Sequence, residues 1–402
     1  MAANDIVDVV VVGGGPSGAT AAHDLARAGR KVVLLDRAGR IKPCGGAIPP
    51  RLIRDFEIPD HLLVARVNSA RMISPLDQRV DMPIDGGFVG MVDRDVFDEW
   101  LRRRAADAGA RRQTGVFKSF KHCKDFTVVS YEERDDCGNV TDREILTRSV
   151  IGADGALSAV ARQCLPGADR LPYVFAYHEI VRSPAREQAD FDGTRCDVYY
   201  KGSVSPDFYG WVFPHGDTVS VGTGTARKGF SLKQSVVDLR AAAGLGAVET
   251  IRREGAPIPL HPLPRWDDGH SVLLAGDAAG VVAPASGEGI YYAMCGGRLA
   301  ADAVDEFLRT GKVRALRSAR RRFMRMHGIV FRILGIMQWY WYSNDRRRER
   351  FVTICKDRDV QKLTWDSYMN KELVLAKPIA HVRIFFKNLS HMAGLAVSYV
   401  KG

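Results

Sequence analysis

The sequence predicts an α/β protein, α+β overall, in which a Rossmann-type dinucleotide-binding domain is joined to an antiparallel β-sheet domain and a C-terminal helical region. Three observations predict this architecture. A short apolar strand runs into a glycine-rich turn at residues 13–18, and short strand-like segments between turns fill residues 165–265. The basic excess of the chain lies beyond residue 310. A chain of 402 residues is long enough for two or three such units.

The start of the chain carries a dinucleotide-binding fingerprint. A buried strand, a glycine turn, a helix and a second strand follow one another within residues 8–36. Gly13 allows the tight turn, Gly15 lets a pyrophosphate approach the backbone, and Gly18 lets helix and strand pack closely. Asp36 ends the second strand, where it can accept hydrogen bonds from a ribose. A glycine turn in an ordinary βαβ unit is the alternative, and the agreement of all the parts disfavours it.

The loop Lys42–Ala47 follows this unit. Two glycines after Cys44, just beyond the expected ribose-binding carboxylate, suggest a loop that lies close to the cofactor. On spacing alone, a turn that contains a buried thiol is the favoured alternative.

The next hundred residues complete the first domain and begin the second. Residues 66–92 alternate like antiparallel strands of the second domain. A helix then runs to residue 108, and either Asp93 or Asp95 can cap it. Residues 114–150 have the pattern of a β-meander.

An aromatic strand marks residues 165–265. Alternation places Tyr209, Trp211 and Phe213 on one face of a strand, where they form an aromatic wall. The face of a hydrophobic core is the default reading of such a stripe. Further along, a buried strand at 271–275 leads to a glycine-rich loop at 284–289, which feeds the N-terminus of a helix.

Charge and cysteine usage exclude several classes. Residues 311–402 hold 20 Lys and Arg against 6 Asp and Glu, a net charge of +14, whereas the first 310 residues carry −3. Seven cysteines without a C-x-x-C pair indicate neither a disulfide framework nor a zinc site, and no metal is expected. The N-terminus has no signal-peptide pattern, so we expect a reducing, cytoplasmic-side location.

Several motifs together resemble flavoproteins of the p-hydroxybenzoate hydroxylase superfamily. The glycine fingerprint, Arg94, the run Ala153–Gly155 and the Gly276–Asp277 pair carry that resemblance. The Lys42–Gly46 loop, the pattern Pro-x-x-Tyr-x-Trp-x-Phe-Pro ending at Pro214 and the loop 284–290 narrow it to geranylgeranyl reductases, closest to the (bacterio)chlorophyll branch. The resemblance covers nearly the whole chain.

The resemblance implies FAD as cofactor and assigns a set of residues to it. It implies an FAD-binding domain of residues 1–65, 93–164 and 266–310, a substrate domain of residues 66–92 and 165–265, and a helical region of residues 311–402. The alkene is expected against Tyr209, Trp211 and Phe213. Cys44 is the candidate either for proton delivery or for shaping the flavin face, and water or the flavin itself is the alternative donor. The expected cofactor-binding residues are Gly13, Gly15, Ser17, Gly18, Asp36, Arg37, Cys44, Gly45, Gly46, Arg94, Asp154, Gly276, Asp277, Gly287, Glu288, Gly289 and Ile290.

The implied reaction is hydrogenation of the C=C bonds of a geranylgeranyl group. Hydride from the reduced flavin and a proton would add to the alkene, and an aromatic wall suits the positive character that develops on carbon. NADPH is the expected electron donor and would bind without a second glycine fingerprint, since the sequence contains none. The substrate is geranylgeranyl diphosphate or a geranylgeranylated pigment. Alternatives are a flavin monooxygenase, a reductase of other polyprenyl lipids and a non-enzymatic membrane-bound assembly factor.

The basic tail is expected to contact a membrane surface. Residues 324–342 are apolar but are interrupted by Arg325 and Arg332, which makes a membrane span unfavourable. Arginine runs at 320–322 and 346–348 flank this segment and favour an anionic leaflet. A soluble helical domain with solvated basic faces is an equal alternative. Nucleic-acid binding is not expected, because no recognition motif accompanies the charge.

Overall fold

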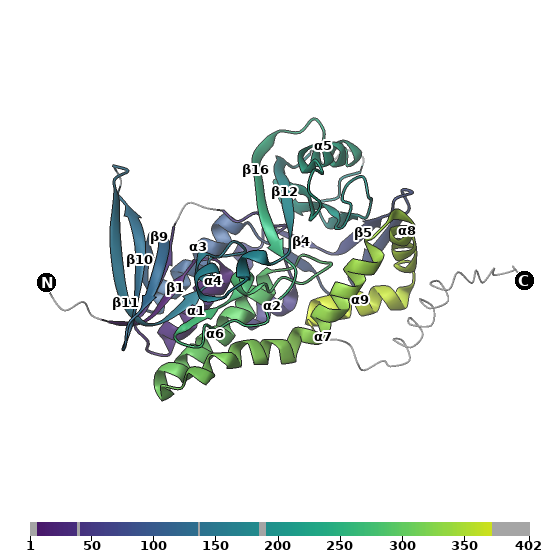
Figure 1. Cartoon of the computed structure of the whole chain (residues 1–402). Helices are drawn as coiled ribbons and strands as arrows, with labels where there is room; N and C mark the ends of the chain where they lie inside the picture. Colours follow the sequence, from purple (N-terminus) through teal and green to yellow (C-terminus); the bar gives the residue numbers. More distant parts are fainter. Residues whose placement is uncertain (1–5, 38–40, 136, 185–189, 372–402) are drawn as a thin grey trace, which may run out of the picture.

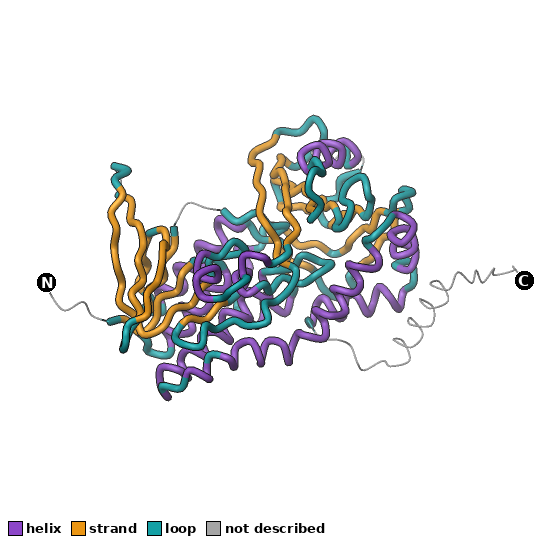
Figure 2. Tube along the Cα trace, in the orientation of Figure 1, coloured by secondary structure: helices purple, strands orange, loops and turns teal. Residues whose placement is uncertain are grey.

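Two large β-sheets and a set of C-terminal helices make up the part of the chain that the computed structural model describes, namely residues 6–37, 41–135, 137–184 and 190–371 (Figures 1 and 2). The first sheet and its helices lie to the left in Figure 2, and the second sheet stands above the centre. The predicted fold class is therefore confirmed in its main parts.

The first sheet combines a parallel core with an antiparallel extension. Its order is β8-β2-β1-β11-β10-β9, with β17 paired to the far half of β11. β1 is parallel to both β2 and β11, as the fingerprint predicts, and β9 to β11 form the predicted meander. The strands are β1 (Val7–Val12), β2 (Val32–Asp36), β8 (Arg111–Thr114), β9 (Val116–His122), β10 (Thr127–Arg134), β11 (Val140–Gly152) and β17 (Val272–Leu274).

Helices pack against this sheet and bury its apolar strands. β1 is apolar throughout its second half, and Val9, Val10 and Val11 have no exposed surface, as expected of a strand covered on both faces. Asp93 stands at the N-cap of α3, but its carboxylate contacts His215 at 2.9 Å instead of the helix, so the predicted cap is wrong. The helices are α1 (Pro16–Arg27), α3 (Arg94–Asp107), α4 (Ala159–Cys164) and α6 (Ile290–Thr310).

The second sheet holds the predicted substrate domain. Its order is β16-β12-β15-β14-β13-β5-β6, and α5 (Leu232–Ala242) packs against it. All neighbours are antiparallel except β13 and β5, which corrects the expectation of a purely antiparallel sheet. The strands are β5 (Ser69–Ile73), β6 (Arg79–Pro83), β12 (Tyr173–Arg182), β13 (Arg195–Tyr199), β14 (Gly210–His215), β15 (Thr218–Thr225) and β16 (Thr250–Pro259).

A small third sheet, which the sequence did not predict, links the two units. It joins β3 (Ala47–Ile48), β7 (Val89–Met91) and β4 (Ala65–Val67). β3 belongs to the predicted cofactor-binding segment and β7 to the predicted substrate segment. Short turns of helix complete the chain: α2 (Pro50–Asp55), η1 (Asp60–Leu62), η2 (Ala168–Arg170), η3 (Gly276–Ala279) and η4 (Val313–Ala315).

The C-terminal helices α7 (Arg317–Trp341), α8 (Asp345–Ile354) and α9 (Arg358–Asn370) cross the lower and right parts of Figure 1. Trp341 and Tyr342 are buried in a cluster that continues into the second sheet, whereas Trp339 is 75% exposed. Arg348 is also buried and pairs with Asp345. The expectation that residues 324–342 and the arginine run 346–348 contact a membrane surface is therefore wrong for these buried members. None of the helices described here is long and apolar enough to cross a membrane.

Candidate active site

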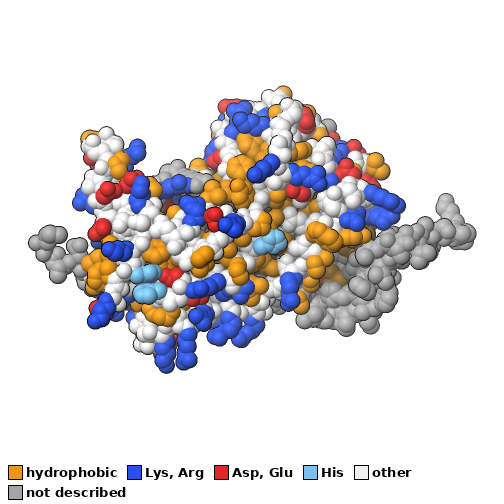
Figure 3. Space-filling view, viewed as in Figure 1, with side chains coloured by type: hydrophobic (Ala, Val, Ile, Leu, Met, Phe, Trp, Pro, Cys, Tyr) orange, Lys and Arg blue, Asp and Glu red, His pale blue; other side chains and the backbone are white. Residues whose placement is uncertain are grey.

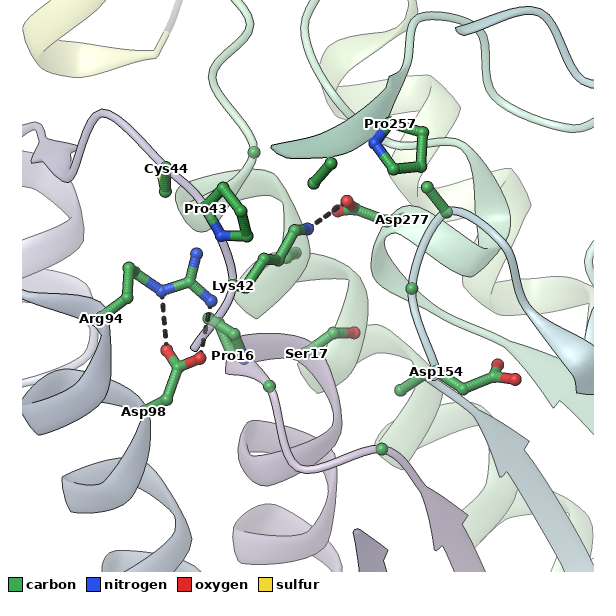
Figure 4. Close-up of a pocket in the computed structure, with 18 of the residues that line it drawn as sticks. Pro16, Ser17, Lys42, Pro43, Cys44, Arg94, Asp98, Asp154, Pro257 and Asp277 are labelled. Carbon is green, nitrogen blue, oxygen red and sulfur yellow. Dashed lines mark hydrogen bonds and ion pairs between the residues drawn. The ribbon is translucent and has the colours of Figure 1, made fainter. Parts of the chain in front are cut away.

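A cavity of about 500 Å³ lies between the two large sheets. One part is lined by the glycine turn after β1 and by the ends of β2 and β11, and the other by β12, β14 and β16 of the second sheet. Its size falls in the range of small-molecule sites. Figure 4 shows the start of α1 facing the loop around Cys44 and the turn around Asp277 across this space.

The structure confirms the predicted roles of Gly13 in the tight turn and Gly18 in close packing, whereas the role of Gly15 toward a pyrophosphate stays a prediction. Gly13 has φ +103°, in the left-handed region, and a Cβ there would lie 2.4 Å from the carbonyl oxygen of Ala153. A Cβ on Gly18 would lie 1.9 Å from the Gly13 carbonyl oxygen, so helix and turn touch here. A Cβ on Gly15, by contrast, would meet nothing within 4 Å and would project into open space.

This cradle fits the phosphates of a dinucleotide. Ser17 is buried at the start of α1, and its hydroxyl has no hydrogen-bond partner among the described residues. A buried polar atom without a partner is unusual, and a phosphate oxygen would satisfy it. The helix N-terminus adds free N–H groups and positive potential at the same place.

Asp36 and Arg37 both line the cavity, as predicted. One carboxylate oxygen of Asp36 accepts a hydrogen bond from the N–H of Gly14 at 2.7 Å, so this side chain also fixes the glycine turn. Its role toward a ribose stays a prediction. Asp154 lines the cavity too, but its carboxylate accepts hydrogen bonds from Ser158 and from the Ala159 N–H at the start of α4. Its predicted contact with the cofactor is untested, and what the structure shows is a helix cap.

The loop that carries Cys44 crosses the cavity. Lys42 forms an ion pair with Asp277 on the opposite side, and Figure 4 shows this pair spanning the space. Cys44 lines the cavity, and its sulfur accepts a weak hydrogen bond from the Gly46 N–H at 3.4 Å. A Cβ on Gly45 would lie 3.0 Å from the ring of Phe213, so the loop rests directly on the aromatic strand.

Arg94 provides a fixed positive charge beside this loop. Its guanidinium makes two hydrogen bonds to Asp98, of 2.8 and 2.7 Å. Burial lowers the pKa of Arg94, but the attraction and hydrogen bonds of Asp98, with smaller contributions from the Cys44 side chain, together outweigh burial, and the net pKa is raised. Arg94 and Cys44 both line the cavity.

The predicted aromatic wall forms in the second sheet. Tyr209, Trp211 and Phe213 all line the cavity, with successive ring centres 6.1 and 6.4 Å apart. The Tyr209 hydroxyl donates to the carbonyl oxygen of Ser286 at 2.6 Å, and burial raises its pKa, so it remains protonated. Phe208, which the sequence argument left out, stacks on Tyr209 at 4.2 Å and also lines the cavity.

The loop 284–289 lines one side of the cavity, and an ion pair anchors it to the C-terminal region. Gly287, Gly289 and Ile290 line the cavity, as does Asp277, whereas Gly276 and Glu288 lie behind the wall. Glu288 forms a buried ion pair with Lys371 at the end of α9. Burial raises the pKa of Glu288 and lowers the pKa of Lys371, and the attraction within the pair opposes both shifts.

Several side-chain contacts at the site, and the cavity residues Asp98 and His178, were not predicted from the sequence. The Arg94–Asp98 pair has i,i+4 spacing, which could have revealed it. The Lys42–Asp277 and Glu288–Lys371 partners lie 235 and 83 residues apart, and no local pattern predicts them. His178, which also lines the cavity, belongs to a strand without any motif. No group of three or more potential metal ligands occurs among the described residues.

Comparison with known proteins agrees with this geometry. The family model described as lycopene cyclase protein matches residues 8–392. Geranylgeranyl diphosphate reductase of Rhodobacter capsulatus is 58% identical over 390 residues, which cover 96% of this chain and 98% of that protein. The chloroplastic geranylgeranyl diphosphate reductase of Oryza sativa subsp. japonica is 38% identical and covers 94% of this chain and 84% of its own length.

The solved structures give the same fold. A geranylgeranyl bacteriochlorophyll reductase-like protein from Thermoplasma acidophilum superposes with a TM-score of 0.79 at 21% identity, covering 93% of this chain and 99% of that one. Fold and glycine cradle together define a protein of the Rossmann-type dinucleotide-binding class. The extent and identity of the sequence matches go further, and the chain belongs to the geranylgeranyl reductase family.

Proposed function

We propose that this protein is an FAD-dependent reductase that hydrogenates C=C bonds of a geranylgeranyl group with electrons from NADPH, in the formation of (bacterio)chlorophyll. The observation that carries the proposal is the aromatic wall of Tyr209, Trp211 and Phe213, which lies in the same cavity as the glycine cradle. The names of the curated relatives, geranylgeranyl diphosphate reductases, support the substrate class.

The chain's own residues bind the cofactor and shape the reaction space. The glycine turn and Ser17 would hold the pyrophosphate, and Asp36 the ribose. FAD, when bound and reduced, supplies hydride. An isolated alkene is not electrophilic, so the residues around it must exclude water and favour developing positive charge. The aromatic faces of Tyr209 and Trp211 do both, because they are apolar and present a negative π-surface.

Proton delivery is assigned to the Cys44 loop. Cys44 is the thiol that lines the cavity in the described chain, together with Arg94 and the aromatic wall. Tyr209 is a poor candidate because its hydroxyl already donates to Ser286 and burial raises its pKa. A thiol at this position can serve in one of two roles: it gives its proton to the less substituted carbon of the alkene, or it shapes the flavin face. Variants at Cys44 distinguish these two roles.

Anaerobic mixing tests the proposal against a monooxygenase of the same fold. The purified protein is reduced with one equivalent of NADPH and then mixed with geranylgeranyl diphosphate without oxygen. A reductase reoxidises its flavin, seen as recovery of the absorbance near 450 nm, because the alkene accepts the electrons. A monooxygenase stays reduced until oxygen enters, and its NADPH oxidation consumes oxygen in a substrate-dependent way. Failure of NADPH to reduce the flavin would overturn the proposed donor.

We also propose that the protein associates peripherally with the cytoplasmic side of a membrane, through α7. An exposed apolar stripe follows the helix at the spacing of one face: Met326, Ile329, Ile333, Ile336 and Trp339. Arg325 and Arg332 are exposed on this face as well. Figure 3 shows Lys and Arg side chains gathered along the lower edge, where Figure 1 places the start of α7. Apolar residues interleaved with arginines suit an anionic lipid surface.

Liposome binding tests this surface. Changing Ile336 and Trp339 to Gln, or Arg325 and Arg332 to Gln, should each weaken binding to vesicles of phosphatidylglycerol and phosphatidylcholine and leave the FAD content unchanged. Salt should weaken the wild type, because screening acts over about 8 Å at physiological ionic strength. Arg134→Gln, at an exposed arginine of β10 in the first sheet, is the matched control. Equal binding of all variants would exclude α7 as the contact surface.

A further inference from the structure

One line of laterally paired residues runs across four strands of the second sheet and includes Trp211 of the aromatic wall. Trp211 on β14 lies opposite Gly222 on β15, which lies opposite His178 on β12, which lies opposite Glu254 on β16. On β15, β12 and β16, the next line along the same face holds small residues: Gly224, Ala176 and Ala256. His178, Ala176 and Ala256 line the cavity together with Trp211. The small side chains of Ala176 and Ala256 therefore leave space in the cavity, and Trp211 and His178 lie along one side of that space.

A continuous hydrogen-bond chain joins Trp211 to Glu254 through Ser220 and His178. The indole N–H of Trp211 donates to Ser220 Oγ at 3.0 Å, and Ser220 Oγ contacts Nδ1 of His178 at 3.0 Å. Nε2 of His178 contacts a carboxylate oxygen of Glu254 at 2.9 Å. One proton arrangement satisfies every contact: Ser220 donates to His178 Nδ1, and His178 Nε2–H donates to Glu254.

Both ring nitrogens of His178 are used within this chain. His178 is 2% exposed and Ser220 is fully buried. The imidazole therefore has no free nitrogen to offer to a substrate, and its geometry is that of a group that holds another side chain. The buried indole N–H groups of Trp266 and Trp365, by contrast, have no partner among the described residues. A hydrogen-bonded indole is therefore not a general feature of the buried tryptophans in the described chain.

Because Gly222 has no side chain, the side chains of Trp211 and His178 pack directly against its backbone. A Cβ at this position would lie 2.3 Å from Cζ2 of Trp211 and 2.5 Å from Cβ of His178. Such distances are far inside van der Waals contact, so any side chain at Gly222 must push the indole or the imidazole aside. The position of the indole is thus fixed from below by Gly222 and at its N–H by Ser220.

We infer that Glu254, His178 and Ser220 are positioning residues that fix the plane of Trp211 as the surface against which the isoprenoid alkene lies. The inference rests on the proposed function and deepens it. The π-face of Trp211 stabilises developing positive charge only if the ring faces the reacting carbon, because the attraction depends on geometry. An indole free to rotate would still bind an apolar chain but would favour the transition state less.

The chain contains a matched control for this device. His122, in the first sheet, contacts Asp268 at 2.8 Å and Thr127 at 3.1 Å, which is the same imidazole, carboxylate and hydroxyl arrangement. None of these three residues lines the cavity. Loss of His122, whose side chain is 30% exposed against 3% for His178, reports the structural cost of removing such a histidine at a more exposed position.

The test measures Trp211 directly and catalysis separately. Ser220→Ala removes the acceptor of the indole N–H and should change the near-ultraviolet circular dichroism, and this change should vanish in a Trp211→Phe background. Ser220→Ala and His178→Gln should lower kcat on the order of tenfold with a smaller change in KM, because a lost buried hydrogen bond loosens the ring. Ser220→Thr, which keeps the hydroxyl, should restore both. Gly222→Ala should reproduce the loss by displacing the ring from the backbone side.

Two results would overturn the inference. The first is a Ser220→Ala protein with wild-type dichroism and kcat. The second is a His122→Gln protein that loses as much kcat as His178→Gln, which would reveal a common structural cost. If the wild type reduces no alkene at all, the proposed function fails, and the dichroism of Ser220→Ala still decides whether the chain positions Trp211.

Discussion

The two halves of the cavity are built in opposite ways. The nucleotide half comes mainly from one turn, in which Gly13, Gly15 and Gly18 act through their missing side chains. The aromatic half is assembled from separate segments that side-chain contacts hold together, as when Tyr209 bonds Ser286 and Lys371 pairs with Glu288. A site made by backbone is decided locally, whereas a site made by distant side chains depends on the whole fold. Substitutions should therefore abolish cofactor binding in the first half and change turnover or stability in the second.

Gly15→Val tests the nucleotide half and should have the largest effect on activity, because no product forms without FAD. The Val side chain would enter the open space above Gly15 without meeting protein atoms, because a Cβ there has no neighbour within 4 Å. We expect a folded protein whose melting temperature stays within about 3 °C but whose FAD affinity falls by more than about tenfold, or about 1.4 kcal/mol. Flavin absorbance after gel filtration measures this.

Gly18→Ala is the matched control for the same turn. Its Cβ would lie 1.9 Å from the Gly13 carbonyl oxygen, so it should unfold or distort the turn and not simply fill the cradle. Full flavin content in Gly15→Val would show that the phosphates lie elsewhere.

Cys44→Ser tests chemistry at the boundary between the halves. Serine keeps the shape, but its hydroxyl is a much weaker acid than a thiol. If Cys44 gives the proton, product formation should fall by about 10²–10³-fold, a typical contribution of general acid catalysis, while NADPH still reduces the flavin. Cys123→Ser, at a half-buried cysteine outside the cavity, should be neutral. Wild-type turnover in Cys44→Ser would leave Cys44 as a residue that only shapes the loop.

Lys371→Met tests how the aromatic half is held by α9. Removing the partner leaves Glu288 as a buried charge, which costs about 3–5 kcal/mol of unfolding free energy. The double variant Lys371→Met, Glu288→Gln should recover most of this loss, because no charge is then buried. Chemical denaturation of the two variants measures the difference, and equal stability of both would show that the pair is not a structural anchor.

The same variant should acquire a pH dependence. Burial raises the pKa of Glu288, and in Lys371→Met no ammonium opposes that shift. The folded state then binds more protons than the unfolded state, whose carboxyl has a pKa of about 4.3. Stability relative to wild type should therefore fall as pH rises above that value, so the deficit should be larger at pH 8 than at pH 5. A deficit independent of pH would contradict this.

Arg348→Gln should have the smallest effect of the four. Arg348 donates to the carbonyl oxygen of Pro206 at 2.6 Å, next to the aromatic strand, and pairs with Asp345. Losing these charge-assisted bonds should cost about 1.5–3 kcal/mol of unfolding free energy. Arg346→Gln, two residues away and exposed, should stay within about 0.5 kcal/mol. Equal thermal stability of the two variants would mean that the buried position of Arg348 is unimportant.

The same contrast explains what the sequence could predict. The glycine turn, the meander and the aromatic strand follow local rules of spacing and alternation, and the structure has all three. The two glycines after Cys44 suggested a loop near the cofactor, but spacing alone favoured a turn with a buried thiol, and only the resemblance decided between the two. Lys371 could not be linked to Glu288, because nothing local indicates a partner 83 residues away. Arg348 was misjudged because a run of arginines looks exposed in sequence, while burial is decided by tertiary neighbours.

The mass of the product tests the central claim most directly. The purified protein is incubated anaerobically with NADPH and one of two substrates, geranylgeranyl diphosphate or a geranylgeranylated chlorin, in parallel reactions. The products are analysed by mass spectrometry. The account predicts gains of two hydrogens per reduced double bond, with loss of these products in Gly15→Val. A product of unchanged mass, as a cyclase would give, or a gain of one oxygen, as a monooxygenase would give, would contradict it.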